Sequence, residues 1–184
     1  PVGERIACWA EFFIGTPYDR DPLVEYVTKK AIVADERVDC MYLVFRSVEL
    51  ALGNSEEAAV DVALDKRFHS RGVLRDGIVA NYGERFQYGE DMIDSGKWGR
   101  EVTSSLGYCA SVSDERRGRR VPYVPAQELL KNRTKLATGD VVFLVKKPER
   151  RVVGEVIGHM GVVKLENGKV YLIHAAGTKK AGGQ

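Results

Sequence analysis

The dipeptide Asn167-Gly168 constrains the fold of this chain more than any other short feature. Asn-Gly is the preferred pair for a two-residue type I′ hairpin turn, and here it lies between two runs of strand-like residues. A two-residue turn fixes the pairing of the flanking strands, so that Gly161 faces His174. His159 then lies diagonal to His174 on the same face, with about 7–8 Å between the two backbones. The sequence therefore predicts that two of the three histidines lie close together.

The face that carries the two histidines is otherwise apolar. Its remaining side chains are Val163, Leu165, Val170, Leu172 and Ala176, whereas the other face carries Lys164, Glu166, Lys169 and Tyr171. This alternation predicts that the histidine face turns toward the protein. Either histidine alone could be a hydrogen-bonded core residue, but together, with a nucleophile nearby, they indicate a catalytic site. His69 lies among Lys66, Arg67 and Arg71, which favours a surface role.

Hydrophobic periodicity divides the chain into a helical N-terminal part and a C-terminal part made of strands. Helices are expected at 3–14, from Asp39 to Gly53 and at 58–68, with a helical turn at 90–95 and a short helix at 126–132. The middle, from 70 to 120, is rich in glycine and is expected to form loops. Strands are expected at 121–124, 141–145, 152–165 and 169–176. Helices followed by strands predict an α+β fold, with the helices on one side of a mostly antiparallel sheet.

Composition narrows the function. The chain has 184 residues with a formal net charge of +2, which predicts a single globular domain over 1–184 and argues against nucleic acid as a partner. No apolar run approaches the length of a membrane span. The three cysteines, Cys8, Cys40 and Cys109, exclude a disulfide framework and leave at least one free thiol. Cys8 lies on an apolar helix face, which predicts core packing, and Cys109 lies in a loop with no activating partner.

Cys40 is the candidate nucleophile. It lies in the first turn of a predicted helix, where unpaired amides and the helix dipole stabilise an anion and can lower the pKa of a thiol. Asp39 before it is the expected N-cap, although its charge opposes ionisation of the thiol. His159 would be the base and His174 the group that orients it. A small buried residue without chemistry is the alternative interpretation of Cys40.

Several short motifs resemble one family in order along the chain. They are Gly15-Thr16-Pro17-Tyr18, Asp39-Cys40, Arg85-Phe86-Gln87-Tyr88, Val121-Pro122-Tyr123-Val124-Pro125, Thr138-Gly139-Asp140, Gly158-His159-Met160-Gly161-Val162-Val163 and Ile173-His174-Ala175. Together they resemble the NlpC-like cysteine hydrolases of the papain-like superfamily, and more closely the N-acetylmuramoyl-L-alanine amidase-like branch. Met41, Gly158, Gln87 and Ala176 depart from the residues usual in that family. These departures concern the shape of the substrate site and not the three catalytic positions.

The resemblance implies a papain-like fold and a peptidoglycan hydrolase without a metal or other cofactor. Cys40 would be the nucleophile, His159 the base and His174 the third polar residue, while Tyr18 would line the site and serve the oxyanion or be a packed turn aromatic. The bond cut would be the N-acetylmuramoyl-L-alanine amide or one within the stem peptide, and the basic run 116–120 could hold a stem carboxylate. Such an enzyme would be periplasmic or secreted, which agrees with a trimmed chain that begins at Pro1.

Two other functions use the same residues. Cys40, His159 and His174 could be the three protein ligands of a catalytic zinc ion. Alternatively, the chain could be a non-catalytic wall-binding domain that keeps the fold. Chelator sensitivity would indicate the first alternative, and binding to cell walls without product release would indicate the second. The sequence does not predict the oligomeric state.

Overall fold

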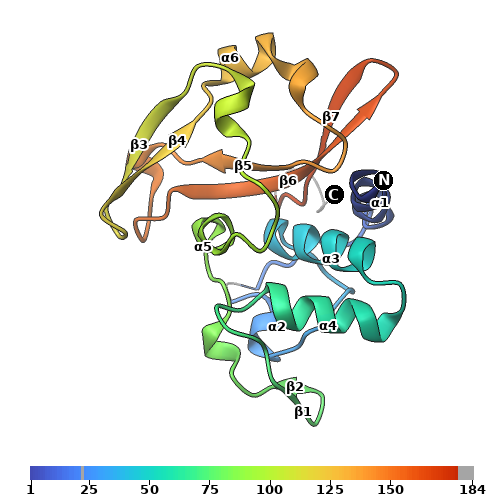
Figure 1. The fold of residues 1–184 in the computed structure, drawn as a ribbon. Helices are drawn as coiled ribbons and strands as arrows, with labels where there is room; N and C mark the ends of the chain where they lie inside the picture. Colours follow the sequence, from blue (N-terminus) through green and yellow to red (C-terminus); the bar gives the residue numbers. More distant parts are fainter. Residues whose placement is uncertain (22, 178–184) are drawn as a thin grey trace.

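A computed structural model describes residues 1–21 and 23–177. Residue 22 and the segment 178–184 of the predicted domain lie outside the described residues. The fold is α+β, as predicted. Its main helices are α1 (Val2–Phe12), α3 (Cys40–Leu52), α4 (Glu56–Lys66) and α5 (Gly89–Ser95), and its central sheet is built from β5 (Val141–Val145), β6 (Ile157–Glu166) and β7 (Lys169–Ile173). Figure 1 shows α1, α3 and α5 beneath this sheet, with α4 farther from it. No helix among the described residues is both long and apolar enough to cross a bilayer.

The helices begin where local capping predicts. The carboxylate of Asp39 accepts a hydrogen bond from the backbone N–H of Tyr42, 2.6 Å away, and the hydroxyl of Ser55 accepts one from the N–H of Ala58 at 3.2 Å. Gly53 ends α3, as expected. Each cap satisfies an N–H group that the first helical turn leaves unpaired.

The central sheet is antiparallel, and its hairpin has the predicted register. Glu166 pairs with Lys169 and Val162 with Ile173 around the turn at Asn167-Gly168. Both turn residues have positive φ, 50° and 73°, as a type I′ turn requires. However, β6 begins at Ile157, so the expected strand at 152–156 is wrong.

The prediction of loops between 70 and 120 missed one hairpin and the first strand of a second hairpin, whose other strand was expected at 121–124. One hairpin is β1 (Leu74–Arg75) with β2 (Ile78–Val79), and the other is β3 (Ala110–Asp114) with β4 (Arg119–Tyr123). The charged run at 113–120 closes the second hairpin. The short helix α2 (Glu25–Thr28) was also missed, while α6 (Ala126–Lys131) was predicted. Figure 1 shows α6 on the opposite side of the central sheet from α3, so the helices are not all on one side.

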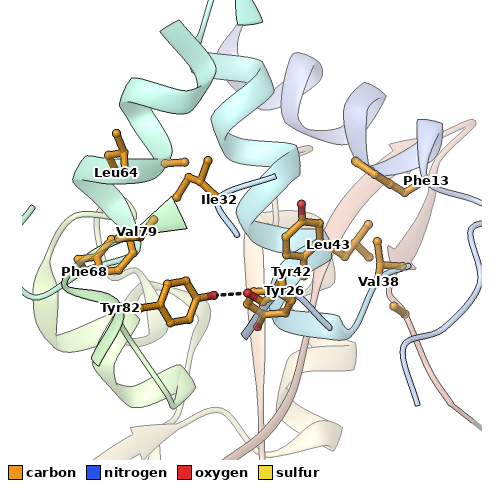
Figure 2. Packing of buried hydrophobic residues seen from close by; sticks show 12 residues of the cluster. Phe13, Tyr26, Ile32, Val38, Tyr42, Leu43, Leu64, Phe68, Val79 and Tyr82 are labelled. Atoms are coloured by element: carbon orange, nitrogen blue, oxygen red, sulfur yellow. Dashed lines mark hydrogen bonds between the residues drawn. The ribbon is translucent and has the colours of Figure 1, made fainter. Parts of the chain in front are cut away.

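Buried side chains on both faces hold β6 in place. Met160 and Val162 are buried on the side of α1 and α3, whereas Val163 packs with Leu106 and Leu136 on the other side. A separate apolar cluster lies between α3, α4 and the segments around them. Figure 2 shows this cluster, in which the hydroxyl of Tyr82 donates to the backbone carbonyl of Tyr26 at 2.9 Å. Packing on two sides of α3 therefore fixes the position of its first residue, Cys40.

Candidate active site

Cys40 is the first residue of α3 and is half-buried. The backbone amide of Met160 on β6 donates toward its sulfur, and so do the amides of Cys40 and Met41. Each of these amides stabilises the thiolate and so acts to lower the pKa of the thiol, and those of Cys40 and Met41 belong to the helix start. They also bring Cys40 beside the strand residue that follows His159.

Burial nevertheless raises the pKa of the Cys40 thiol to about 11, and the charge of Asp39 adds to the rise. The expectation of a lowered pKa is therefore wrong for the substrate-free protein. The helix dipole acts on this thiol, but loss of water around the sulfur outweighs it. At neutral pH, Cys40 is a thiol.

Asp39 lies close to a second carboxylate. The segment of Pro17 to Asp19 runs parallel to Val38: the N–H of Asp19 donates to the Val38 carbonyl, and the N–H of Val38 donates to the Pro17 carbonyl, both at 3.0 Å. This pairing brings Asp19, which is 3% exposed, near Asp39. Burial and the Asp19 charge raise the pKa of Asp39 to about 6, although the N–H of Tyr42 opposes the rise. Nothing in the local sequence pattern indicated the contact with Asp19.

The two histidines lie together, as the hairpin register predicts. Nε2 of His159 is 2.9 Å from Nδ1 of His174, and the rings are perpendicular, with their centroids 4.9 Å apart. Gly161 makes this possible, because a Cβ at that position would lie 2.6 Å from the Ile173 carbonyl oxygen and 3.0 Å from the His174 Cβ. Burial and the nearby His174 lower the pKa of His159. His159 is therefore neutral at pH 7 and can accept a proton.

The histidine face turns toward the protein, as predicted, but away from α1 and α3: Val163 on this face is 1% exposed and packs with Leu106 and Leu136. Met160 and Val162, on the other face of β6, are the residues that pack with α1 and α3. His159 is half-buried and His174 is exposed. Polar residues of the other face occur only near the hairpin turn, where Lys164 forms an ion pair with Glu11 of α1. Farther along β6, the residues from Met160 to Val163 are buried on both faces.

Tyr18 lies near the nucleophile. Burial raises the pKa of its hydroxyl, and the charge of a Cys40 thiolate would raise it further. Its ring is packed against Gly177, where a Cβ would lie 2.5 Å from the Tyr18 Cε1. Tyr18 and His174 also line one small pocket. The described contacts thus link Cys40 to the amide of Met160, and His159 to His174. Within residues 1–21 and 23–177, no hydrogen bond joins Cys40 to either imidazole.

The structure separates the other two cysteines and His69 from this cluster. Cys8 is exposed, so the prediction of core packing is wrong: it lies on the solvent side of α1, and Ala7 and Ala10 are the buried residues of that helix. The thiol of Cys109 is within 3.6 Å of the backbone carbonyls of Thr103 and Gly107. His69 is exposed, as predicted, with its ring edge against Phe86.

The basic run 116–120 is mostly engaged with the protein itself. Arg117 pairs with Asp91, Asp94 and Asp114, and Arg119 pairs with Asp94 and Asp114. The other two arginines of the run also contact the protein. The guanidinium of Arg116 lies 3.7 Å from the centre of the Tyr88 ring, and the guanidinium of Arg120 donates to the hydroxyl of Ser111. These pairs tie the β3–β4 hairpin to α5, so Arg117 and Arg119 are not unpaired cations that could hold a substrate carboxylate.

A metal centre receives no support from the geometry. Within residues 1–21 and 23–177, no group of three or more His, Cys, Asp and Glu side chains is placed so that it could hold a metal ion. The contact between His159 and His174 also commits one nitrogen of each ring to the other.

Comparisons with solved structures show proteins of the same fold. An N-acetylmuramoyl-L-alanine amidase from Bacteroides uniformis ATCC 8492 is 20% identical and superposes with a TM-score of 0.74, covering 97% of this chain and 87% of its own. A protein from Legionella pneumophila str. Philadelphia 1 with the family designation DUF1460 is 16% identical, with a TM-score of 0.74 over 99% of this chain and 80% of its own. A Bacteroides fragilis protein named as a xylanase is 19% identical and superposes with a TM-score of 0.66. The superposition covers 91% of this chain and 86% of the Bacteroides fragilis protein.

Comparisons of sequence alone give no relative. No protein-family model matches the chain, and no curated protein matches it. The likeness to solved structures therefore establishes the fold alone.

Proposed function

We propose that this protein is a cysteine hydrolase that cleaves an amide bond of peptidoglycan. The observation that carries the proposal is the hydrogen-bonded pair of His159 and His174 on the strand and hairpin whose Met160 amide faces the Cys40 sulfur. A nucleophile, a base and a group that orients the base form the triad arrangement of covalent catalysis by a thiol. The resemblance to NlpC-like hydrolases assigns these roles to the same three residues.

The pKa directions favour a general-base mechanism over a preformed ion pair. Cys40 is a thiol and His159 a neutral imidazole in the free protein, so attack on the amide carbonyl would transfer the thiol proton to His159 as the carbon–sulfur bond forms. His159 would then protonate the leaving amine as the carbon–nitrogen bond breaks. Water would then attack the thioester carbonyl while His159 takes its proton. As the carbon–sulfur bond breaks and the carboxylic acid leaves, His159 would return that proton to the Cys40 thiolate.

Two donors are proposed for the oxyanion. The backbone N–H of Cys40 lies at the start of α3, where the helix leaves its amides unpaired, and Tyr18 supplies a hydroxyl close to the sulfur. His174 holds the imidazole of His159 through the contact of 2.9 Å between their ring nitrogens. In this role His174 is a positioning residue.

The substrate is proposed from two sources that agree. The ordered motifs resemble the amidase-like branch, and a solved structure named as an N-acetylmuramoyl-L-alanine amidase shares the fold over 97% of the chain. We place the cut at the N-acetylmuramoyl-L-alanine amide or at a neighbouring stem-peptide bond, and the site of action in the periplasm or outside the cell.

The decisive experiment is a muropeptide digest analysed by mass spectrometry. Wild-type protein should release a product whose mass identifies the bond that is cut, and Cys40→Ala should release none. Cys8→Ala should behave as wild type because Cys8 is exposed on the solvent side of α1. Chelator should leave the rate unchanged. Equal product from wild type and Cys40→Ala would refute the cysteine mechanism, and loss of activity on chelation would favour the zinc alternative. Wall binding without product would favour the non-catalytic domain.

A further inference from the structure

Asp19 is a buried carboxylate to which the proposed function gives no role. It is 3% exposed, and its two oxygens accept hydrogen bonds from backbone N–H groups that follow it in the chain. One bond comes from Asp21 at 3.0 Å and the other from Glu25 at 2.6 Å. Both oxygens thus face the backbone, and the side chain is not presented to a substrate.

The backbone of Asp19 is joined to the segment that leads into the nucleophile. Its N–H donates to the carbonyl of Val38, and the N–H of Val38 donates to the carbonyl of Pro17, both at 3.0 Å. Val38 is two residues before Cys40. Tyr18 lies between Pro17 and Asp19, so its backbone is held parallel to the chain next to Cys40.

The carboxylate of Asp19 extends this anchoring to α2. The N–H of Glu25 that it accepts belongs to the first residue of α2, where the helix itself leaves the amide unpaired. The next residue, Tyr26, packs its ring against that of Tyr42 on α3, with the centroids 4.7 Å apart (Figure 2). The chain after Tyr18 is therefore tied to α3, and the oxygens of Asp19 are the link.

The ring of Tyr18 is confined by a residue distant in the chain. It packs so closely on Gly177 that a Cβ there would lie 2.5 Å from Cε1 of Tyr18. With its backbone held by the contacts of Asp19 and its ring held by Gly177, Tyr18 has little freedom to move relative to Cys40. A donor to an oxyanion needs this restriction, because a misplacement of about 1 Å in an active site can cost about 100-fold in rate.

We propose that Asp19 is a positioning residue, which holds Tyr18 where its hydroxyl can stabilise the oxyanion that forms when Cys40 attacks the amide. The inference rests on the proposed function, in which Tyr18 is one of two oxyanion donors. Asp19 also lies near Asp39, and its charge raises the pKa of that residue. A test must therefore separate the hydrogen bonds of Asp19 from its charge.

A double-mutant cycle between Asp19 and Tyr18 tests the proposal, with muropeptide hydrolysis as the assay. Asp19→Asn keeps the shape of the side chain but replaces one acceptor oxygen by an amide N–H₂ group, so one backbone contact is lost. It should lower kcat by about 10-fold or more and change KM by less than about 3-fold. Tyr18→Phe removes the donor and should lower kcat by about 100-fold. In the Tyr18→Phe protein, Asp19→Asn should change kcat by less than about 2-fold, because the group that it positions is gone.

Substitution of Glu25 breaks the same contact from the other side and leaves the charge of Asp19 in place. Glu25→Pro removes the N–H that Asp19 accepts, at the first position of a helix, where proline is otherwise well tolerated. It should lower kcat as Asp19→Asn does, whereas Glu25→Ala retains the N–H and should keep wild-type kcat. Asp21→Asn is a second control that should keep wild-type kcat, because the Asp21 carboxylate accepts the exposed N–H of Leu23.

The outcomes separate this proposal from the proposed function. If Asp19→Asn lowers kcat by the same factor with and without the Tyr18 hydroxyl, Asp19 acts through its charge or through stability, and the proposal is overturned. Wild-type kcat in Asp19→Asn and Glu25→Pro also overturns it and leaves the hydrolase intact. Where Asp19→Asn does not fold, Glu25→Pro takes its place in the cycle. If wild-type protein cleaves no muramyl peptide at all, the proposed function fails, and the role of Asp19 in it fails as well.

Discussion

Replacing Asp39 by Asn should stabilise the protein at neutral pH and make the Cys40 thiol more acidic. Asn is as good an N-cap as Asp, so its side-chain oxygen can still accept the hydrogen bond from the N–H of Tyr42. The substitution removes the charge that now lies near Asp19 and beside the nucleophile. It therefore tests electrostatics without removing the cap.

The magnitude follows from the pKa of Asp39, which rises from 3.8 to about 6 on folding. Because the folded protein binds this proton more tightly than the unfolded chain, the contribution to stability is complete below about pH 4 and is lost as the pH rises through 6. A rise of this size corresponds to about 3 kcal/mol. Between pH 4 and pH 7, the free energy of unfolding of Asp39→Asn should therefore increase by about 2 kcal/mol relative to wild type.

Urea denaturation of both proteins at pH 4, 5, 6 and 7 measures this difference. Asp65→Asn, at an exposed position on α4, is the matched control and should show no such trend. Alkylation of Cys40 by iodoacetamide should reach half its maximal rate at a lower pH in Asp39→Asn than in wild type, where the thiol pKa is about 11. A stability difference that is the same at pH 4 and pH 7 would refute the reasoning.

Three further predictions test the core and the histidine pair. Arg67→Met should cost about 2–3 kcal/mol in urea denaturation, because the carboxylate of Glu49, which is 0% exposed, loses one of its two arginine partners and keeps only Arg46; a loss below 1 kcal/mol would contradict this. Gly161→Ala should lower kcat at least 10-fold while the protein stays folded, because the added Cβ displaces His174; wild-type kcat would show that the position of His174 does not matter. His174→Gln should move the acidic limb of the kcat/KM profile to higher pH, because the charge of His174 lowers the pKa of His159, and an unmoved limb would exclude that interaction.

The local features of the fold were predictable because they depend on residues close together in the chain. Asp39 and Ser55 cap their helices, and Asn167-Gly168 sets the register that brings His159 to His174. Each of these depends on hydrogen bonds and backbone conformations within a few residues. The position of Cys40 at a helix start was predictable for the same reason.

The environments of those residues were not predictable. The contact between Asp19 and Asp39 depends on a segment 20 residues earlier in the chain, and the burial that raises the pKa of Cys40 depends on β6, more than 100 residues later. The exposure of Cys8 likewise depends on which side of α1 meets the sheet.

Short-range sequence thus placed a thiol at a helix start and two imidazoles on one hairpin. Whether that thiol is ionised, which face of β6 meets the helices and how small the pocket beside Tyr18 is depended on the packed chain. The physical reason is that capping and turn formation act through adjacent groups, whereas desolvation and cavity shape arise only when distant segments exclude water together.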